Sequence, residues 1–310
     1  MKNYKGILFA ILASVAFGLM PIFAKFAYQN GSNPTTVLVF RFSIAAVILF
    51  VYLLITKVSI KVTKKQFLYL FFTGFFGYTI TTQTLFMSYN YLGVGLATTL
   101  HFVYPAFVCI FEYILFKKLM SKNKLASLIF AGIGAYALIA FENNTLSILG
   151  VVLAIISGIS YAGNIIMLAL EELKDVDNRV VTMYLSFGAG VGMILYGLIN
   201  NSLVMTFTVN LVSSYMLISV VSTILSIILL LKGIELIGAS SASILGTFEP
   251  IVSIIMGVIL FGEHLTLALI LGTIFIIIST IILAKDKSSI ETVEELIEEK
   301  NLGELNTEIK

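Results

Sequence analysis

Ten apolar stretches separated by short polar breaks constrain this chain more than any other feature. Each stretch runs for about 17 to 25 residues, the length that an α-helix needs to cross a bilayer. That is twice what a spanning β-strand needs, and no stretch alternates polar with apolar residues, so spanning strands are excluded. We predict an all-α integral membrane protein with ten transmembrane helices at 6–27, 34–56, 67–90, 95–116, 124–141, 146–170, 178–200, 210–231, 241–261 and 265–284.

The composition agrees with lipid as the surrounding solvent. Of the 310 residues, 59% are apolar and 12% are charged, whereas a soluble domain carries about 25% charged residues. The net charge of +2 gives no indication of nucleic-acid binding. One cysteine, Cys109, and two histidines offer neither an internal disulfide nor a nitrogen–sulfur metal site. No phosphate-binding loop or hydrolase motif occurs, so we expect neither a cofactor nor a metal nor an enzyme.

Basic residues are distributed unevenly among the breaks. With a cytoplasmic N-terminus, 17 of the 19 basic residues fall on the cytoplasmic side, at the N-terminus, in alternate loops and in the tail. The loops on the other side hold none, and the remaining two, Lys25 and Arg41, lie within expected helices. Because positively charged loops stay on the cytoplasmic side, we predict a multi-pass protein of the plasma membrane with cytoplasmic N and C termini.

The second half of the chain repeats the first at an offset of 145 residues. The aligned positions are Leu92-Gly93 with Ile237-Gly238, Ala97 with Ala242, Leu100 with Leu245, Tyr104-Pro105 with Glu249-Pro250, and Leu115-Phe116 with Leu260-Phe261. Each copy holds five spans, an odd number, so the second copy must be inverted relative to the first. Inverted repeats recur in secondary transporters. We expect a five-helix repeat over 1–141, an inverted five-helix repeat over 142–284 and an acidic cytoplasmic tail over 285–310.

Three short elements carry a family resemblance. They are Ala16-Phe17-Gly18 followed by Lys25, Pro34 followed by Phe40-Arg41-Phe42, and Glu249-Pro250-Ile251 followed by Leu260-Phe261-Gly262-Glu263-His264-Leu265-Thr266. Through these elements the chain resembles the EamA family of the drug/metabolite transporter superfamily, across about residues 6–284. The resemblance implies ten helices in two inverted repeats, and export or exchange of amino acids, related metabolites or drugs.

Few charged side chains remain within the expected helices, and each needs a reason because a charge in hydrocarbon costs about 3 kcal/mol. Glu249 precedes Pro250, and a proline-bent helix carrying a carboxylate near mid-membrane is typical of a transport path. Tyr104 and Pro105 hold the equivalent place in the first half, so Tyr104 is also a candidate for the path and both prolines are candidate helix breaks. The alternative for Glu249 is a carboxylate that pairs with another helix or stays protonated.

Five further side chains are candidates for the path. Arg41 could bind a carboxylate or phosphate, or could instead clamp helices or reach the headgroups. His101 could relay protons or pack through a hydrogen bond; we place it, like Arg41, nearer the outer gate. Gln83 and Asn164 are costly to expose to lipid, so they should face the interior, on a cavity wall or in interhelical hydrogen bonds. Tyr78 could supply an aromatic wall or lie at an interface.

These features predict a secondary transporter that exports amino acids or related small polar metabolites by alternating access. Its partners would be the small-molecule substrate and the lipid bilayer, and a homodimer stays open because no helix stands out as a dimer face. A nucleotide-sugar or drug carrier of the same superfamily is one alternative. A non-transporting scaffold or receptor subunit is another, and it would need no polar core. A membrane-embedded enzyme is disfavoured because the intramembrane charges are scattered.

Overall fold

The computed structural model describes residues 2–117, 121–140, 147–168, 170–173, 175–230, 232–233, 236, 245–246 and 248–284. All regular structure among them is helical, as predicted. The expected tail over 285–310 lies outside the described residues, as do Gly238 and Ala242 of the sequence repeat.

The helices follow the predicted order. Those of the first half are α1 (Lys2–Gly18), α2 (Met20–Gln29), α3 (Pro34–Ile55), α4 (Lys64–Phe72), the π-helical segment η1 (Thr73–Tyr78), α5 (Thr79–Leu92), α6 (Val94–His101), α7 (Tyr104–Phe116) and α8 (Lys122–Ala140). Those of the second half are α9 (Ile148–Leu168), the 3-10 turn η2 (Glu171–Leu173), α10 (Asn178–Ile199), α11 (Val209–Ser219), the π-helical segment η3 (Val220–Leu225), α13 (Phe248–Phe261) and α14 (Leu267–Ala284).

Capping residues in the sequence explain where several helices begin. Asn33 accepts a hydrogen bond from the backbone N–H of Thr36 at the start of α3. Thr63 forms a capping box with Gln66 at the start of α4. Side-chain oxygens of this kind satisfy the free N–H groups of a first helical turn. Gly93, at φ 78°, separates α5 from α6 because it adopts a backbone conformation that other residues disfavour.

Two expected helices are interrupted, and two continuous ones contain a π-helical turn, η1 or η3. The helix expected over 6–27 divides at Leu19 into α1 and α2, a break that we did not predict although Pro21 lies in the first turn of α2. The helix expected over 95–116 divides between His101 and Tyr104, with Pro105 in the first turn of α7. The segment 64–92 is continuous but contains the π-helical turn η1. Wide turns of this kind are frequent at functional sites.

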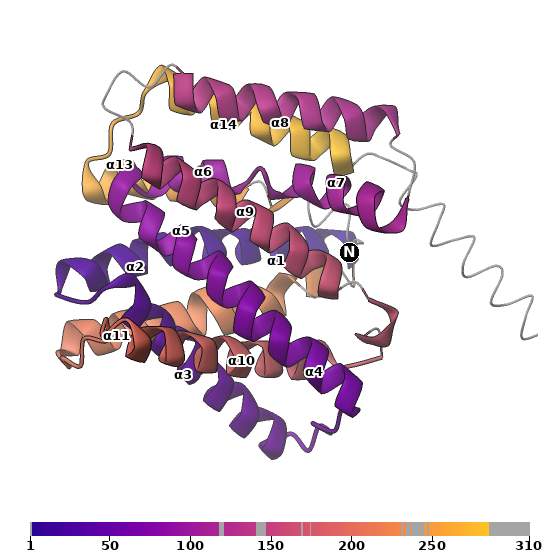
Figure 1. Cartoon of the computed structure of the whole chain (residues 1–310), viewed down its shortest axis with the longest axis vertical. Helices are drawn as coiled ribbons and strands as arrows, with labels where there is room; N and C mark the ends of the chain where they lie inside the picture. Colours follow the sequence, from indigo (N-terminus) through magenta and orange to yellow (C-terminus); the bar gives the residue numbers. More distant parts are fainter. Residues whose placement is uncertain are drawn as a thin grey trace, which may run out of the picture.

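The packing has approximate two-fold symmetry between the halves. α3 packs along α10 and α8 along α14, each pair joining one helix from each half. Other contacts between the halves occur in symmetry-related pairs. α1 packs on α13, and its counterpart α9 packs on α6 and α7. In the same way α2 packs on α11, and α9 packs on α5. Figure 1 shows α8 and α14 together along one edge of the molecule and α3, α10 and α11 along the opposite edge.

Corresponding helices of the two halves run in opposite directions. α2 ends where Lys25 pairs with Glu263, close to Val94 at the start of α6. α9 begins at this same end, where its Gly150 lies against the last residues of α5, and it runs back toward the start of α4. α1 and α2 therefore run opposite to α9, their counterpart, as Figure 1 also shows. We call this end of the molecule the far end.

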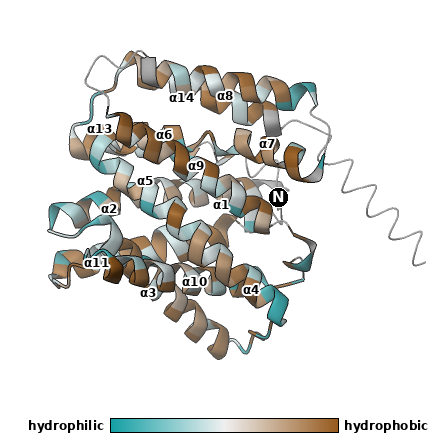
Figure 2. Cartoon of the chain, in the orientation of Figure 1, coloured by the Kyte–Doolittle hydropathy of each residue, from teal (hydrophilic) through white to brown (hydrophobic). Residues whose placement is uncertain are grey.

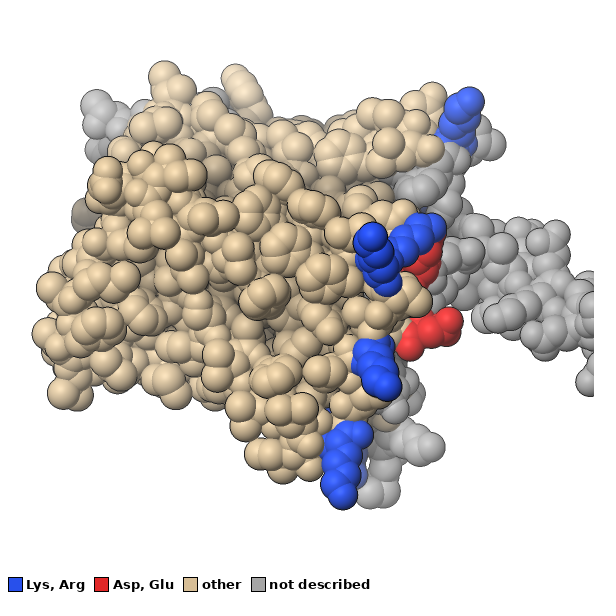
Figure 3. Space-filling view, turned by 60° about the horizontal axis from the view of Figure 1, so that its bottom comes forward, with Lys and Arg blue, Asp and Glu red and all other residues tan. Residues whose placement is uncertain are grey.

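Lysine and arginine side chains mark the other end, which we call the basic end. Lys57 follows α3, Lys64 and Lys65 begin α4, and Arg179 lies in the first turn of α10. Apolar contacts between the end of α3, the following loop and the start of α10 hold these segments together. Figure 3 shows Lys and Arg side chains gathered at one end of the molecule.

The outer surface is apolar between the two ends. Large apolar side chains such as Val47, Ile114 and Ile259 are 62%, 62% and 68% exposed, and hydrophobic residues predominate along the helices in Figure 2. Six helical spans of the described residues are long and apolar enough to cross a membrane. The other four expected spans fall on the helical segment 64–92 and on α8, α13 and α14, and their crossing stays a prediction.

Candidate functional site

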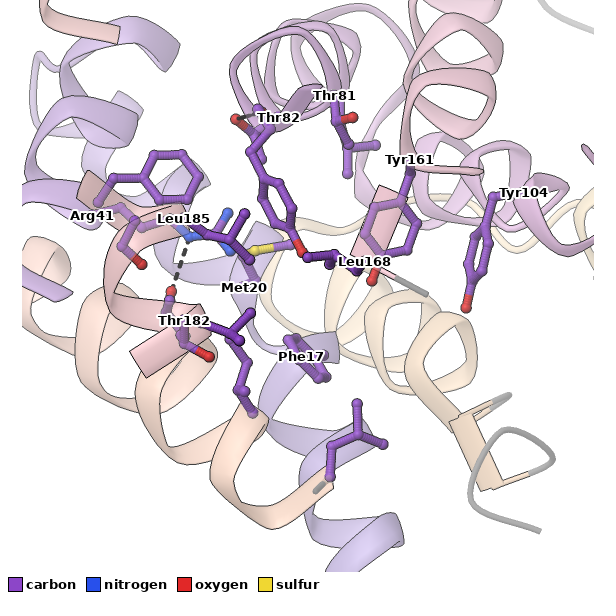
Figure 4. A pocket seen from close by; sticks show the side chains of 18 of the residues that line it. Phe17, Met20, Arg41, Thr81, Thr82, Tyr104, Tyr161, Leu168, Thr182 and Leu185 are labelled. Carbon is purple, nitrogen blue, oxygen red and sulfur yellow. Dashed lines mark hydrogen bonds between the residues drawn. The ribbon is translucent and has the colours of Figure 1, made fainter. Parts of the chain in front are cut away.

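A cavity of about 360 Å³ lies between the two halves. Its wall is built from helices of both: α1 to α3, η1, α5 to α7, α9, α10, η3 and α13. Figure 4 shows Arg41 on one side of the cavity and Tyr104 on the other, with apolar side chains such as Phe17 and Met20 between them.

Residues that correspond between the halves line the cavity together. In the third and fourth helices of each half the offset is 145, since Thr63 and Thr208 cap equivalent helices. In α3 and α10, both of 22 residues and capped by Asn33 and Asp177, the offset is 144. The lining pairs are Arg41 with Leu185, Phe42 with Ser186, Tyr78 with Thr223, Thr82 with Ile227, Leu85 with Leu230, and Tyr104 with Glu249. The cavity therefore lies on the approximate symmetry axis, while its chemistry differs between the two sides.

Arg41 is the cationic group of the wall. It is only 6% exposed, and its Nε donates a hydrogen bond of 2.9 Å to Thr223 Oγ1 on η3. Its guanidinium carbon lies 4.9 Å from the centre of the Phe42 ring. Nη1 has no hydrogen-bond partner among the described residues. A buried guanidinium with an unused donor can bind a carboxylate or phosphate oxygen.

Glu249 is the anionic group of the wall. It lies in the first turn of α13, beside Pro250. The backbone carbonyl of Glu249 is fixed against α1, because a Cβ atom added at Gly18 would lie 2.8 Å from it. Ser253 also donates a hydrogen bond of 3.0 Å to the Gly18 carbonyl. Glu249 and Arg41 line the same cavity, and no ion pair joins them among the described contacts.

Aromatic rings cover the side of the cavity opposite Arg41. Tyr104 and Tyr161 meet edge to face at 4.8 Å between ring centres, and Tyr78 lies 6.4 Å from Tyr161. The His101 ring lies 5.7 Å from Tyr104 and 5.4 Å from Tyr161. Ring faces of this kind attract cations, so this side of the cavity suits a positively charged group.

Five of the seven residues predicted for the path line the cavity: Glu249, Tyr78, Tyr104, Arg41 and His101. Gln83 and Asn164 do not. Gln83 donates a hydrogen bond of 3.0 Å to Thr35 on α3, and Asn164 donates one of 3.0 Å to Thr81 on α5. These interhelical hydrogen bonds match the alternative interpretation, although Gln83 Oε1 has no hydrogen-bond partner among the described residues. A part for either amide in the transport path stays a prediction.

At the far end of the molecule, one polar cluster joins α2, α6 and the segment between α13 and α14. Lys25 Nζ lies 2.8 Å from Glu263 Oε1, and the side chains are 24% and 17% exposed. The Glu263 carboxylate also accepts hydrogen bonds from the backbone N–H groups of Val94, at 2.8 Å, and Gly95, at 3.2 Å. Gly257 leaves room for the carboxylate, which a Cβ atom there would meet at 2.6 Å. We call these contacts the far-end latch.

The wall extends toward the basic end. Leu173, Asn178, Val181 and Thr182, all near the start of α10, line the cavity. The α3 residues that correspond to Val181 and Thr182 are Val37 and Leu38, which are 1% and 0% exposed in the apolar core. Equivalent residues therefore line an open space in one half and a packed core in the other.

Some lining residues were not predicted. Thr223 and Leu185 correspond to Tyr78 and Arg41, so applying the repeat to those two candidates would have identified them. Phe17 and Met20 reach the wall at the interruption between α1 and α2, for which Pro21 was the available signal.

The comparisons with known proteins agree with this architecture. The model of the EamA-like transporter family matches residues 4–140 and again 148–285. An uncharacterized transporter, YcbK, of Bacillus subtilis is 26% identical over 277 residues, covering 86% of this chain and 88% of its own length. An uncharacterized inner membrane transporter, YicL, of Salmonella typhimurium is 24% identical over 295 residues, covering 91% and 96%. A crystal structure matches with a TM-score of 0.64 at 11% identity, over 90% of this chain and 96% of that one, and indicates the fold alone.

Proposed function

Because this chain belongs to the EamA-like transporter family, we propose that it exports amino acids or related small zwitterionic metabolites across the cytoplasmic membrane. Family and relatives make it a multi-pass membrane transporter. Beyond this, the proposal specifies the substrate class, the direction of transport and the membrane in which the protein lies.

One observation carries the substrate class. Among the described residues of the cavity wall there are one cation, Arg41, and one anion, Glu249, with aromatic rings beside them. An α-amino acid presents a carboxylate to the Arg41 fork and an ammonium to Glu249 and the rings. A volume of about 360 Å³ is within the usual range of small-molecule sites.

The direction of access follows from the two ends. We take the basic end as cytoplasmic because basic loops remain on that side, which puts both termini in the cytoplasm. The cavity then faces the cytoplasm, and the far-end latch seals the outside. If the two similar halves exchanged conformations, the far end would open and the basic end would become packed. The cavity would then be accessible from alternate sides of the membrane, in a protein of ten helices arranged as two inverted repeats.

Reconstitution into liposomes tests this function. Vesicles that contain the purified protein and are preloaded with an unlabelled amino acid should take up the labelled form of that amino acid by exchange. Protein-free vesicles should not. A panel of the twenty amino acids identifies the preferred solute. Arg41→Gln should lower the exchange by about a hundredfold or more, whereas Ser186→Ala, on the same wall but uncharged, should retain it. Exchange that Arg41→Gln leaves intact, or no exchange with any amino acid, contradicts the proposal.

A further inference from the structure

His101, in the last turn of α6, is the cavity residue whose proton position is fixed by its neighbours. Its Nδ1 lies 2.8 Å from Ser157 Oγ on α9. The same Oγ lies 2.9 Å from the backbone carbonyl of Thr81 on α5. Ser157 is 0% exposed, so water does not compete for its hydroxyl.

Donor and acceptor counting then assigns the tautomer. A serine hydroxyl has one hydrogen to donate, and a carbonyl can only accept. The Ser157 hydrogen therefore goes to the Thr81 carbonyl, and the Oγ lone pair must accept a hydrogen from His101. Neutral His101 thus carries its proton on Nδ1 and a free lone pair on Nε2.

That lone pair is available to a solute. Nε2 makes no hydrogen bond with any residue of the described ranges, and His101 belongs to the cavity wall. The groups beside it are the rings of Tyr104 and Tyr161 and, on the same wall, Glu249. Figure 4 places Tyr104 and Tyr161 away from Arg41. This side of the cavity therefore offers a nitrogen acceptor, a carboxylate and ring faces, which together suit a group that is both cationic and a hydrogen-bond donor.

We propose that His101 Nε2 is the acceptor for an ammonium or amine N–H of the solute, and that Ser157 is the positioning residue that keeps this nitrogen unprotonated. The site would select N–H donors over quaternary ammonium groups, which have no hydrogen to give. This inference rests on the proposed function in assuming that an amine-bearing solute enters the cavity.

The sequence makes a direct measurement practical, because it contains only two histidines. The second, His264, is exposed before α14, so His264→Gln leaves His101 as the single histidine signal. Nitrogen-15 spectra of histidine-labelled protein in detergent micelles should show protonated Nδ1 and unprotonated Nε2. Protonated Nε2 in the neutral ring would overturn the proposal. Ser157→Ala should produce a mixture of tautomers. Ser160→Ala, one turn along α9, should not, since Ser160 binds Gly77 and Thr81 but not His101.

A titration in the same samples tests ligand recognition without any transport. Methylammonium carries N–H groups and should move the Nε2 resonance, with a half-saturating concentration at least about tenfold lower than that of tetramethylammonium, as one charged hydrogen bond provides. Equal responses would mean that the ring faces alone recognise the cation, and no response would mean that Nε2 binds no amine; both overturn the proposal. If vesicles move no amino acid while methylammonium still binds Nε2, the proposed function fails and the site stands.

Discussion

The two ends of the cavity are built from corresponding helices, yet one is open and the other is packed. Val181 on α10 lines the open part, whereas Val37, the corresponding valine on α3, is 1% exposed in the core. The two valines are identical, so the side chains themselves do not explain the difference. Under the alternating access proposed above, this is a difference of conformation between two similar halves.

The two ends differ more in their polar contacts than in their apolar packing. The far end is held by the Glu263 carboxylate, which binds Lys25 and two backbone N–H groups of α6. The basic end has only exposed or half-exposed ion pairs, Lys65 with Glu172 and Arg179 with Asp177, among the described residues. In the other half, Lys118 stands where Glu263 would have its counterpart, so an equivalent latch cannot form there with a carboxylate. Under the proposed alternating access, this asymmetry would favour the state with a closed far end.

The largest expected effect is at Arg41, the charge that distinguishes one side of the cavity from the other. Arg41→Gln should lower amino-acid exchange by about a hundredfold or more, because losing the partner of a buried charge costs about 2–5 kcal/mol. Arg41→Lys should recover only part of the activity, since an ammonium cannot form the two-pronged contact. Initial rates in proteoliposomes measure both. Full activity in Arg41→Gln would contradict the proposal that the substrate is an amino acid whose carboxylate binds Arg41.

Glu249 and Tyr104 occupy corresponding places and allow the two halves to be compared directly. Glu249→Gln should lower exchange by about tenfold, the effect of one charged hydrogen bond. Tyr104→Phe keeps the ring face and should change the rate by less than about threefold. Rates for both variants, normalised to protein in the vesicles, give the comparison. An equal loss in both would indicate a shape requirement rather than a charge.

Breaking the latch should loosen the far end alone. Glu263→Gln weakens the acceptor for Val94 and Gly95, so hydrogen exchange of these amides should accelerate by about tenfold. Lys25→Met leaves the carboxylate on both amides and should accelerate them less. Hydrogen–deuterium exchange read by mass spectrometry measures both variants. If the Val94 and Gly95 amides of Glu263→Gln exchange hydrogen no faster than those of the parent, the far-end latch does not hold α6.

The smallest effect is expected at the basic end. Hydrogen bonds from Arg179 hold the pKa of Asp177 below its ordinary value. The stabilisation is therefore present above pH about 4, and is lost as the pH falls through the lowered pKa. Both side chains are 34% exposed, so the contribution should be below about 1 kcal/mol. Thermal unfolding of Asp177→Asn and of the parent should differ slightly at pH 7 and converge near pH 3. A difference that grows on acidification would contradict this assignment.

The repeat was the most informative sequence feature because residues that it pairs lie together on the cavity wall. Tyr104 and Glu249 were paired by the 145-residue offset, and both lie on the wall. The intramembrane charge Arg41 was also a candidate for the path, since a buried guanidinium needs polar surroundings, and it lines the cavity; its role there stays a prediction.

Other features had no readable signal. Gln83 and Asn164 look like Arg41 in a hydropathy profile, and only the packed helices show that Thr35 and Thr81 bind them. The π-helical turn η3, which brings Thr223 to Arg41, has no proline or glycine to mark it. Val37 and Val181 are identical and correspond in the repeat, so the sequence could not show which of them lies in the packed core.

Thiol reactivity at the two corresponding valines tests the central claim most directly. In a Cys109→Ala background, Val181→Cys and Val37→Cys would be treated with a membrane-impermeant thiol reagent from each side of oriented vesicles. The account predicts that Val181→Cys reacts from the cytoplasmic side, and that Val37→Cys is protected until Glu263→Gln opens the far end, when it reacts from outside. Val37→Cys that stays protected while the Glu263→Gln vesicles still exchange amino acids would contradict the exchange of conformations between the halves.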